Sequence, residues 1–579
     1  MATAKATNYR FRNRLIRACV ILLVLVGGVR WVQSVPKADL REACQVLTVV
    51  SSQEKSSLLA AAAKDYNATT PGATAGCFRV AVRQVASGTA EAALARGWDE
   101  QTDGPRPDVW SPAATTWVVL LRQHRGLADA STLLPDSSPS LLQSPLVIAM
   151  PRPMAAAMGW PDAPLGWGDI LSLAHDPGGW GRYGHPEWGR FQLGKTSPDS
   201  STSGIHALIA AYFAATGLSA DLTEQDVADP KVREFVSGVE SSVVHYGGTV
   251  STFLTNLQAA DRSGRGPSYV SAIAVEEQQV WTYNHSTPAP VTPLVAVYPR
   301  EGTLVADHPY VVLKAPWVDE ARRAAAEDFL RHLMSDGPRR QFKAAGFRDG
   351  TGQAPPFMTP TSGFLPAQPA VVIKPPAPPV LAAIQSAWPA VRKRARILVV
   401  IDVSGSMDGS KLDLVKAAAT NALDLLGPED EVGLWIFSSN LDGALPYRQI
   451  EPIARLAQSR DALKRSINLL RAGGGTGLYR TARASADFMR TGLDRSRINA
   501  VLLLTDGQDT DNCCDLNPTV SALMARNESG AVRIFTIGYG TDADMGVLRR
   551  ISGATEAVAY QATDTSSIGK VLADVVSNF

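Results

Sequence analysis

The chain has 579 residues, enough for about three or four structural units of ordinary size. Hydrophobic residues make up 45% and charged residues 19%, which excludes both a disordered polyelectrolyte and a multi-span membrane protein. The net charge is only +1, from 56 Lys and Arg against 55 Asp and Glu. Nucleic acid is therefore not expected as a partner, because such binding depends on clustered cations. Five cysteines are too few for a disulfide scaffold.

The N-terminal segment predicts export from the cytoplasm. An apolar run over 18–29 follows four arginines, and no acidic residue occurs before Asp39. The positive-inside rule then keeps a basic segment, 1–13, in the cytoplasm and places the bulk of the chain outside. Because the run is shorter than the ~20 residues of a comfortable span, two interpretations stay open. The favoured one makes 14–34 a transmembrane helix that anchors the protein in a bacterial cell membrane as a single-pass protein. The other makes it a signal peptide whose cleavage leaves a secreted protein.

The first two cysteines of the exported region predict a disulfide bond. Cys44 lies just before one apolar strand-like run, 46–50, and Cys77 directly precedes another, 78–85, with a helical pattern between them. Adjacent parallel strands of a β-α-β unit begin at the same edge of a sheet, so the two side chains are expected to meet there. A Cys44–Cys77 bridge is consistent with an oxidising compartment.

Two α/β regions are expected, with a linker between them. Residues 40–350 alternate short apolar runs with helical patterns, and residues 396–579 repeat this alternation more regularly. Between them, 351–395 is rich in proline, which predicts a semi-rigid extended linker. Such a linker is expected to let the two regions orient independently.

The C-terminal region contains oxygen-bearing side chains at three predicted strand-end loops. The first loop holds Asp402, Ser404 and Ser406 directly after an apolar run, the second holds Thr476 among glycines, and the third holds Asp506 at the end of AVLLLTD. Open α/β sheets bind ligands at the carboxyl ends of their strands. An all-oxygen ligand set suits a hard cation, so the five residues predict a Mg²⁺ site, with Mn²⁺ or Ca²⁺ as alternatives.

These five residues, with their DxSxS, Gly-flanked Thr and TDG contexts, resemble the metal-ion-dependent adhesion site of the von Willebrand factor A family. The resemblance covers about residues 396–579 and implies a doubly wound domain. It also implies that the three hydroxyls coordinate the ion directly and that the two carboxylates act largely through water. The ion would then attract an Asp or Glu carboxylate from a partner protein. The resemblance thus predicts metal-dependent capture of a protein.

Residues 40–350 resemble a two-lobed periplasmic solute-binding protein. The resemblance depends on the order of the segments VVSSQEKSSLL, PDVWSPAATTW, SPLVIAMP and AAAEDFLRHLMSDGPRRQFKAAGFR. It implies an extracellular domain whose lobe one comprises about 40–143 and 290–350 and whose lobe two comprises about 144–289.

Hydroxyl-rich turns at predicted helix starts suggest a ligand cleft in this domain. Helix N-termini offer free N–H groups and a partial positive charge, which suit a small polar or anionic ligand. The expected cleft residues are Ser52, Ser87, Gly88, Ser111, Ser201, Thr202 and Ser203. The alternative is that these residues are ordinary helix caps. Lys195 and Arg83 either pair with an anion or are surface charges.

The favoured function is a membrane-anchored extracytoplasmic binding protein that captures a protein partner through a Mg²⁺-dependent adhesion site. Its solute-binding-like domain is expected to bind a small polar or anionic ligand. The alternative is a solute receptor of a transport system that uses the C-terminal domain to recruit partners. An enzyme is not expected, because the eight histidines form no HExxH motif and no GxSxG motif occurs. The string 189–196 (GRFQLGKT) matches a phosphate-binding loop pattern but lacks the required strand before it and a helix directly after it.

Overall fold

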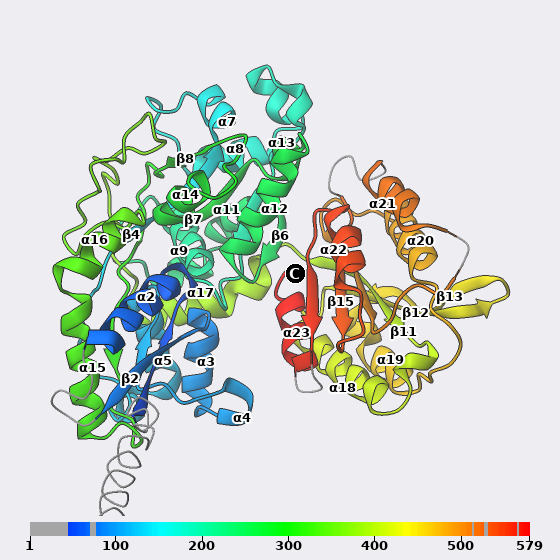
Figure 1. Ribbon diagram of the computed structural model, residues 1–579. Helices are drawn as coiled ribbons and strands as arrows, with labels where there is room; N and C mark the ends of the chain where they lie inside the picture. The colour runs from blue at the N-terminus through cyan, green and yellow to red at the C-terminus, as the bar shows by residue number, and fades with distance from the viewer. Residues whose placement is uncertain (1–43, 70–76, 512–513, 526–530, 564–566) are drawn as a thin grey trace, which may run out of the picture.

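The computed structural model describes residues 44–69, 77–511, 514–525, 531–563 and 567–579, and these residues form three β-sheets with flanking helices (Figure 1). Two sheets belong to the N-terminal region and one to the C-terminal domain, so the expected α/β class is observed. The expected cytoplasmic segment 1–13 and transmembrane helix 14–34 lie outside the described residues. Across the described ranges, no helix combines the length and apolar character that a membrane span requires.

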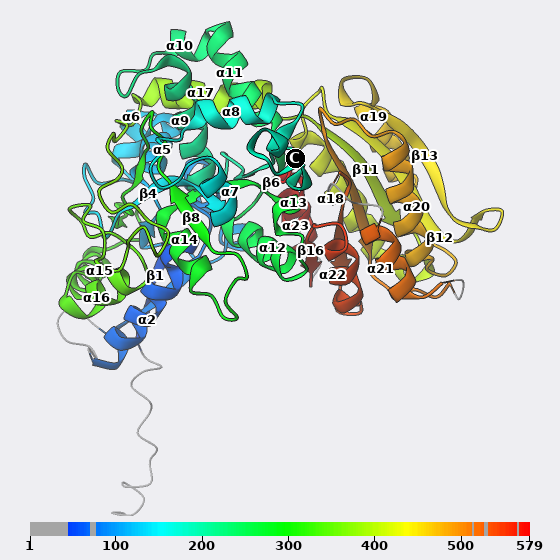
Figure 2. The same cartoon turned by 90° about the horizontal axis from the view of Figure 1, so that it is seen from above.

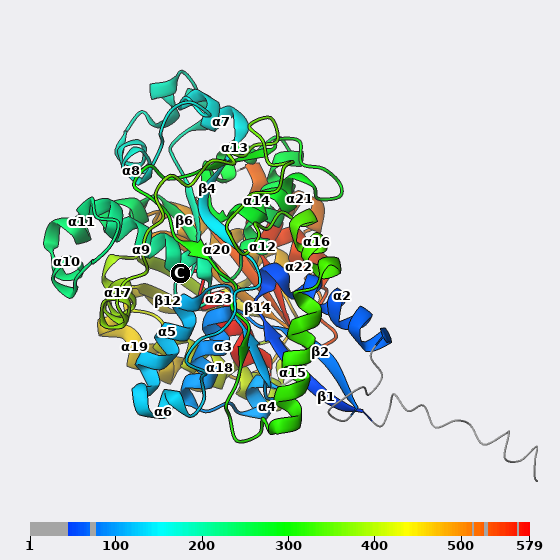
Figure 3. The ribbon, with the colours of Figure 1, turned by 90° about the vertical axis from the view of Figure 1, so that its left-hand side faces the viewer.

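Lobe one contains a four-stranded sheet in the order β10-β3-β1-β2, in which only β10 runs antiparallel to its neighbour. Its strands are β1 (Gln45–Ser51), β2 (Phe78–Gln84), β3 (Val109–Ser111) and β10 (Val311–Val312). Its helices are α2 (Gln53–Thr69), α3 (Ser87–Arg96), α4 (Glu100–Asp103), α5 (Thr115–Arg125), α6 (Leu127–Ser131), α15 (Glu320–Leu333) and α16 (Asp336–Ala344). Helices α2 and α15 lie side by side along this sheet (Figure 3).

Lobe two contains a mixed sheet in the order β6-β5-β7-β4-β8, with β9 paired to β4. Its strands are β4 (Ser144–Pro151), β5 (Leu193–Thr196), β6 (Val243–Gly247), β7 (Ala272–Glu276), β8 (Leu294–Val297) and β9 (Val305–Ala306). Its helices are α7 (Arg152–Ala157), α8 (Trp167–His175), η1 (Gly179–Tyr183), η2 (Pro186–Trp188), α9 (Thr202–Thr216), α10 (Glu224–Ala228), α11 (Pro230–Ser241), α12 (Val250–Arg262), α13 (Gly266–Tyr269) and α14 (Glu277–Asn284). Every residue of β4 is buried, as expected of a central strand covered on both faces.

The chain returns to lobe one later than the expected residue 290. Strand β8 pairs antiparallel with β4, and β9 also pairs with β4, so both belong to lobe two. The return therefore follows β9 and leads into β10, which pairs with β3 of lobe one. The apolar run LVAV of β8 gave no signal for which sheet it would join.

The proline-rich segment 351–395 is not the extended, independent linker that its composition predicted. Met358, Phe364 and Ile373 are buried, and the Ile373 N–H donates to the Thr303 carbonyl oxygen at 2.8 Å. Its second half forms α17 (Pro378–Val391), which packs against α5, α9, α10 and α11. The segment packs against the domain because burial of the apolar side chains between its prolines lowers the free energy, and an exposed extended chain would lose that gain.

The C-terminal domain contains a six-stranded sheet in the order β13-β12-β11-β14-β15-β16. All neighbours are parallel except β12 and β13, which form a long hairpin at one edge (Figure 2). The strands are β11 (Ala395–Asp402), β12 (Glu431–Asp442), β13 (Leu445–Arg455), β14 (Ile498–Thr505), β15 (Arg533–Tyr539) and β16 (Ala559–Ala562). The helices are η3 (Gly405–Met407), α18 (Ser410–Leu425), α19 (Leu456–Asn468), α20 (Leu478–Thr491), α21 (Leu516–Ala525), α22 (Met545–Gly553) and α23 (Ser567–Val576).

The C-terminal domain packs directly against lobe two, near the C-terminus of the chain (Figure 1). The Tyr246 N–H of β6 donates to the Asn578 carbonyl oxygen at 2.9 Å. The His245 ring meets the Phe535 ring edge-on with centroids 5.9 Å apart, and Arg265 pairs with Glu556 at 3.3 Å. These contacts give the two regions a defined relative position, in contrast to the independent orientation that the sequence suggested.

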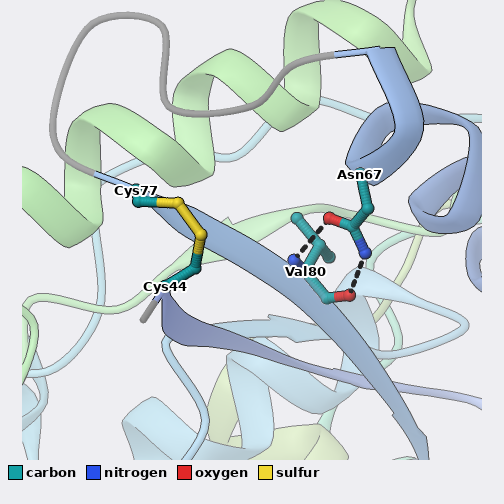
Figure 4. The surroundings of a disulfide bond; sticks show 4 residues. All are labelled: Cys44, Asn67, Cys77 and Val80. Atoms are coloured by element: carbon teal, nitrogen blue, oxygen red, sulfur yellow. Dashed lines mark hydrogen bonds between the residues drawn. A yellow bond between two sulfur atoms is a disulfide. The ribbon is translucent and has the colours of Figure 1, made fainter. Parts of the chain in front are cut away.

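The predicted disulfide between Cys44 and Cys77 is confirmed (Figure 4). The register pairs Gln45 with Phe78, so the two cysteines lie at the same edge of the sheet with Cα atoms 4.6 Å apart. Asn67 ties the end of α2 to β2, because its side chain accepts from the Val80 N–H and donates to the Val80 carbonyl oxygen, both at 2.9 Å.

Removing this disulfide is expected to lower the free energy of unfolding substantially. The bond closes a loop with a sequence separation of 33 residues. Chain-entropy arithmetic for such a loop gives about 3–4 kcal/mol. The measurement is urea unfolding of the Cys44→Ser, Cys77→Ser double variant beside the native protein. A loss below about 1 kcal/mol would contradict a stabilising role for this bond.

Candidate functional site

Two of the predicted metal-site carboxylates, Asp402 and Asp506, lie at the carboxyl ends of the neighbouring strands β11 and β14. These strands are parallel neighbours, and their register pairs Ile401 with Leu504, so Asp402 and Thr505 lie side by side. The Thr505 Oγ1 donates to Asp402 Oδ2 at 2.5 Å. Asp506 follows immediately, so two of the predicted carboxylates reach the same edge of the sheet. Both are buried.

The turn after β11 directs the serine hydroxyls to the same place. The Ser404 N–H donates to Asp402 Oδ1 at 2.8 Å, which fixes the turn. The Ser404 and Ser406 Oγ atoms lie 3.0 Å apart, and the Ser406 hydroxyl donates to Asp506 Oδ1 at 2.6 Å. The first and third predicted loops therefore form one cluster of oxygens.

The glycine loop that carries Thr476 is hydrogen-bonded to the DxSxS turn, which places Thr476 near this cluster. The Gly405 N–H donates to the Gly474 carbonyl oxygen at 2.9 Å. A Cβ atom placed on Gly507 would lie 3.5 Å from Ser406 Oγ and 3.5 Å from Thr476 Oγ1. The two hydroxyl oxygens are therefore separated by no more than twice 3.5 Å. A side chain at position 507 would point toward the space between them.

The two serine hydroxyls have the spacing that a small divalent cation requires of neighbouring ligands. Octahedral Mg²⁺ binds oxygens at about 2.1 Å, which places neighbouring ligands about 3 Å apart. The separation of the Ser404 and Ser406 oxygens matches that spacing. Within the described ranges, no three His, Cys, Asp or Glu side chains gather as a metal-binding group. Binding of Mg²⁺ here stays a prediction.

Burial makes the charged form of Asp402 less favourable. Burial raises the pKa of Asp402 to about 6, against the opposing hydrogen bonds from Ser404 and Thr505 and with the charge of Asp506 adding to the rise. A desolvated carboxylate next to a second carboxylate is stabilised by any positive charge that enters the site.

Two residues that sequence reasoning missed contact the predicted ligands. The Lys411 Nζ, at the start of α18, donates to Asp506 Oδ2 at 2.6 Å, and this hydrogen bond raises the pKa of Lys411. The Thr476 N–H donates to Thr510 Oγ1 at 2.7 Å, which orients the glycine loop. No spacing rule pointed to either residue, because both meet the site only through the tertiary fold.

The residues expected to line the solute cleft are buried and bind other groups of the protein. Ser52 Oγ accepts from Lys55 Nζ at 2.8 Å, Ser87 Oγ accepts from the Ala113 N–H at 3.1 Å, and the Ser111 hydroxyl donates to the Pro309 carbonyl oxygen at 2.8 Å. In lobe two, the hydroxyls of Ser201 and Ser203 bond to each other and to Thr196. Ligand contact by these residues stays a prediction.

The two lobes touch directly where the ligand was expected. The Gly88 N–H of lobe one donates to the Ser200 carbonyl oxygen of lobe two at 3.0 Å. A Cβ on Gly88 would lie only 2.1 Å from the Asp199 carbonyl oxygen, so this approach requires glycine. The Trp117 indole N–H donates to Thr202 Oγ1 at 2.8 Å. The cleft is therefore closed at these loops.

The two basic residues considered for anion binding have protein partners. Lys195 lies inside β5, where it is buried and ion-paired with Glu240. This position also explains why the GRFQLGKT string forms no phosphate-binding loop. Arg83 donates to the carbonyl oxygens of Asp103 and Pro105. Lys195 is therefore not available to a solute in this conformation.

A buried histidine at the lobe contact predicts acid sensitivity. His206 Nε2 lies 3.0 Å from Thr116 Oγ1, and burial lowers its pKa to about 3. Because the folded pKa is below the unfolded value of ~6.5, the stability from neutral His206 is complete above pH 6.5 and is lost as the pH falls toward 3. At pH 5 the loss is about 2 kcal/mol.

Urea unfolding at pH 7.5 and pH 5 measures this loss. His206→Gln keeps a hydrogen-bonding partner for Thr116 but does not titrate, so it is expected to reduce the acid-induced loss by about 2 kcal/mol. The exposed His285→Gln serves as the matched control. An unchanged pH dependence in His206→Gln would contradict the prediction.

Comparison with known families identifies both regions. The bacterial extracellular solute-binding protein family matches residues 47–348, more than half of the chain, so the chain belongs to this family. The von Willebrand factor type A domain matches residues 397–574. The resemblances noted in the sequence are therefore confirmed. The two domains indicate an extracytoplasmic protein that binds a small molecule and interacts with proteins.

Known proteins and solved structures align with large or small parts of this chain. An uncharacterized protein of Mycobacterium tuberculosis is 24% identical over 525 residues, which is 87% of this chain and 72% of the relative. The human inter-alpha-trypsin inhibitor heavy chain H2 is 30% identical over 179 residues, 30% of this chain and 18% of its own. Among solved structures, the periplasmic binding protein AfuA from Actinobacillus pleuropneumoniae aligns with 55% of this chain and 91% of its own at 14% identity and a TM-score of 0.36.

Proposed function

We propose that this protein is a membrane-anchored extracytoplasmic binding protein that captures a protein partner through a Mg²⁺-dependent site in its C-terminal domain. The proposal is supported chiefly by the convergence of Asp402, Ser404, Ser406, Thr476 and Asp506 at one edge of the sheet. The N-terminal domain supplies a second, small-molecule binding function. Binding rather than catalysis is the proposed activity of both domains.

The residues of the site have distinct parts in the proposed capture. Ser404, Ser406 and Thr476 would hold the ion through their hydroxyl oxygens, while Asp402 and Asp506 orient those hydroxyls and balance the charge. When bound, Mg²⁺ would supply a positive charge that attracts an Asp or Glu carboxylate of a partner. Because the hydroxyl ligands would be neutral and the family resemblance implies that the carboxylates act largely through water, much of that charge would stay available to the partner.

Anchoring by residues 14–34 belongs to the same proposal. An uncleaved helix would keep residues 1–13 inside and both domains outside the membrane, with lobe one following the anchor along the chain. Extracellular labelling of the domains on intact cells, together with retention of the full-length chain in the membrane fraction, is the expected result.

Capture from a cell-envelope extract tests the proposed site. The immobilised protein is expected to retain a partner in Mg²⁺, to release it in EDTA and to lose it in Thr476→Ala. Asp413→Ala, a substitution of an exposed carboxylate on the neighbouring helix α18, serves as the control and is expected to retain the partner. Capture that survives both EDTA and Thr476→Ala would contradict the metal bridge.

A further inference from the structure

A cavity of about 350 Å³ lies between the two lobes of the N-terminal domain. Lobe one contributes α2 and the end of β2, and lobe two contributes α12 and α14. Its polar lining includes Gln53, Glu54, Gln84, Ser251, Gln278 and Gln279. The Gln53 side-chain amide donates to Ser251 Oγ at 2.7 Å, so a hydrogen bond between the lobes lies in the wall of the cavity. The volume suits a small solute.

The lining is rich in acceptors and lacks cations. None of the residues that line the cavity is Lys, Arg or His. Glu54 brings a carboxylate, and its Oε2 is buried with no hydrogen-bond partner in the part of the chain that the structure describes. A buried acceptor without a donor costs free energy, which a donor from a bound solute would recover. An anion would instead meet the Glu54 carboxylate, with no Lys, Arg or His in the cavity lining to balance it.

A second carboxyl group lies directly before α14, the helix whose first turn lines the cavity. Glu276 precedes α14 and is buried, with its Oε2 3.2 Å from His308 Nε2 and its Oε1 without a partner among the described residues. Burial raises the pKa of Glu276 well above its usual range, and the charge of Glu54 raises it further while Lys55 opposes the rise. The Lys55 ammonium donates to Ser52 Oγ and to two backbone carbonyls, so its hydrogen bonds are spent inside the protein.

We propose that this interlobe cavity is the solute site and that its solute is a small molecule, a sugar or an amine, that donates hydrogen bonds to Glu54 and carries no negative charge. The inference rests on the solute-binding half of the proposed function and does not involve the metal site. It replaces the anionic option that the helix-start loops suggested. Side-chain amides from both lobes would accept from and donate to the solute, so binding would strengthen the contact between the lobes.

Thermal unfolding of the chain from residue 40 to residue 579, in EDTA, tests this proposal without any contribution from the metal site. The probes are glucose, trehalose, inositol, spermidine and putrescine, with sulfate and phosphate as the anionic comparison. At least one sugar or amine is expected to raise Tm by a few degrees at saturation, and neither anion is expected to do so. Stabilisation by sugars alone or by amines alone identifies the source of the donors, and either result supports the proposal.

Two variants and one control link the effect to the cavity. Glu54→Gln keeps the shape of the side chain but removes its charge, and it is expected to weaken binding of the active probe about tenfold or more by titration calorimetry. Ser57→Trp, at an exposed position in the lining, is expected to block the cavity without disturbing the core. The exposed Glu327→Gln on α15 is expected to bind normally. Stabilisation by an anion, no stabilisation by any sugar or amine, or unchanged affinity in both variants would overturn the proposal.

Discussion

Replacing Asp402 by Asn is expected to abolish the Mg²⁺-dependent gain in stability of the protein. A ligand present at 100 times its Kd stabilises the folded state by about 2.7 kcal/mol, and the variant should lose that whole increment. The physical reason is the removal of a buried negative charge that balances the cation. Asn keeps an oxygen that accepts from the Ser404 N–H, so the turn after β11 is expected to remain folded.

Thermal unfolding with Mg²⁺ and with EDTA is the corresponding measurement. Thr476→Ala provides an independent variant, because it removes one hydroxyl and leaves the backbone bond to Thr510 in place. It is expected to lose most of the same increment. Asp413→Ala should respond to Mg²⁺ as the native protein does. An undiminished response in both Asp402→Asn and Thr476→Ala would mean that Mg²⁺ binds elsewhere.

Replacing Glu240 by Ala is expected to destabilise the protein by about 3–5 kcal/mol. Glu240 is fully buried and pairs with the buried Lys195, whose ammonium would lose its counter-charge. Glu240 Oε2 also accepts from the Tyr246 hydroxyl at 2.8 Å, and that hydroxyl accepts from the Lys393 N–H at 3.0 Å. The pair therefore connects lobe two to the segment that enters the C-terminal domain.

A double variant separates the charge effect from packing. Lys195→Met with Glu240→Gln removes both charges, keeps similar side-chain volumes and leaves an acceptor for Tyr246. Replacing both members of a buried pair costs far less than removing one, so the double variant is expected to be more stable than Glu240→Ala. Urea unfolding measures the difference. Equal stability of the two variants would show that the loss comes from packing.

In the C-terminal domain, the sequence predicts those strands that consist of a continuous apolar run. The runs at 397–401, 500–504 and 533–538 lie inside β11, β14 and β15, because central parallel strands are buried on both faces. The neighbouring strand β13 escaped prediction. It is an edge strand with a single buried residue and no apolar run, so its existence depends on pairing with β12.

The metal-site residues were predictable because strand-end loops of a parallel sheet meet at one edge. Lys411 was not, since a lysine in the first turn of a helix has no distinctive pattern. Motif reasoning therefore proposes a ligand set, but it does not find the side chains, such as Lys411, that contact those residues in the fold.

In the N-terminal domain, the order of segments predicted the two-lobed architecture. It did not predict the contact between the lobes or the packing of the proline-rich segment. Hydroxyls at helix starts looked available to a solute, but sequence alone does not reveal that the lobes close over them. Proline content likewise suggested an open tether, whereas buried residues such as Phe364 and Trp388 fix that segment to the domain. Both errors arise because composition describes local preference and burial is decided by tertiary contacts.

A crystal structure of the protein grown with MnCl₂ would test the central claim most directly, because the anomalous signal of manganese locates the ion. The expected result is one ion within coordination distance of the hydroxyl oxygens of Ser404, Ser406 and Thr476. An ion bound elsewhere, or a saturated crystal in which the Thr476 hydroxyl stays out of reach of the ion, would contradict the proposed adhesion site.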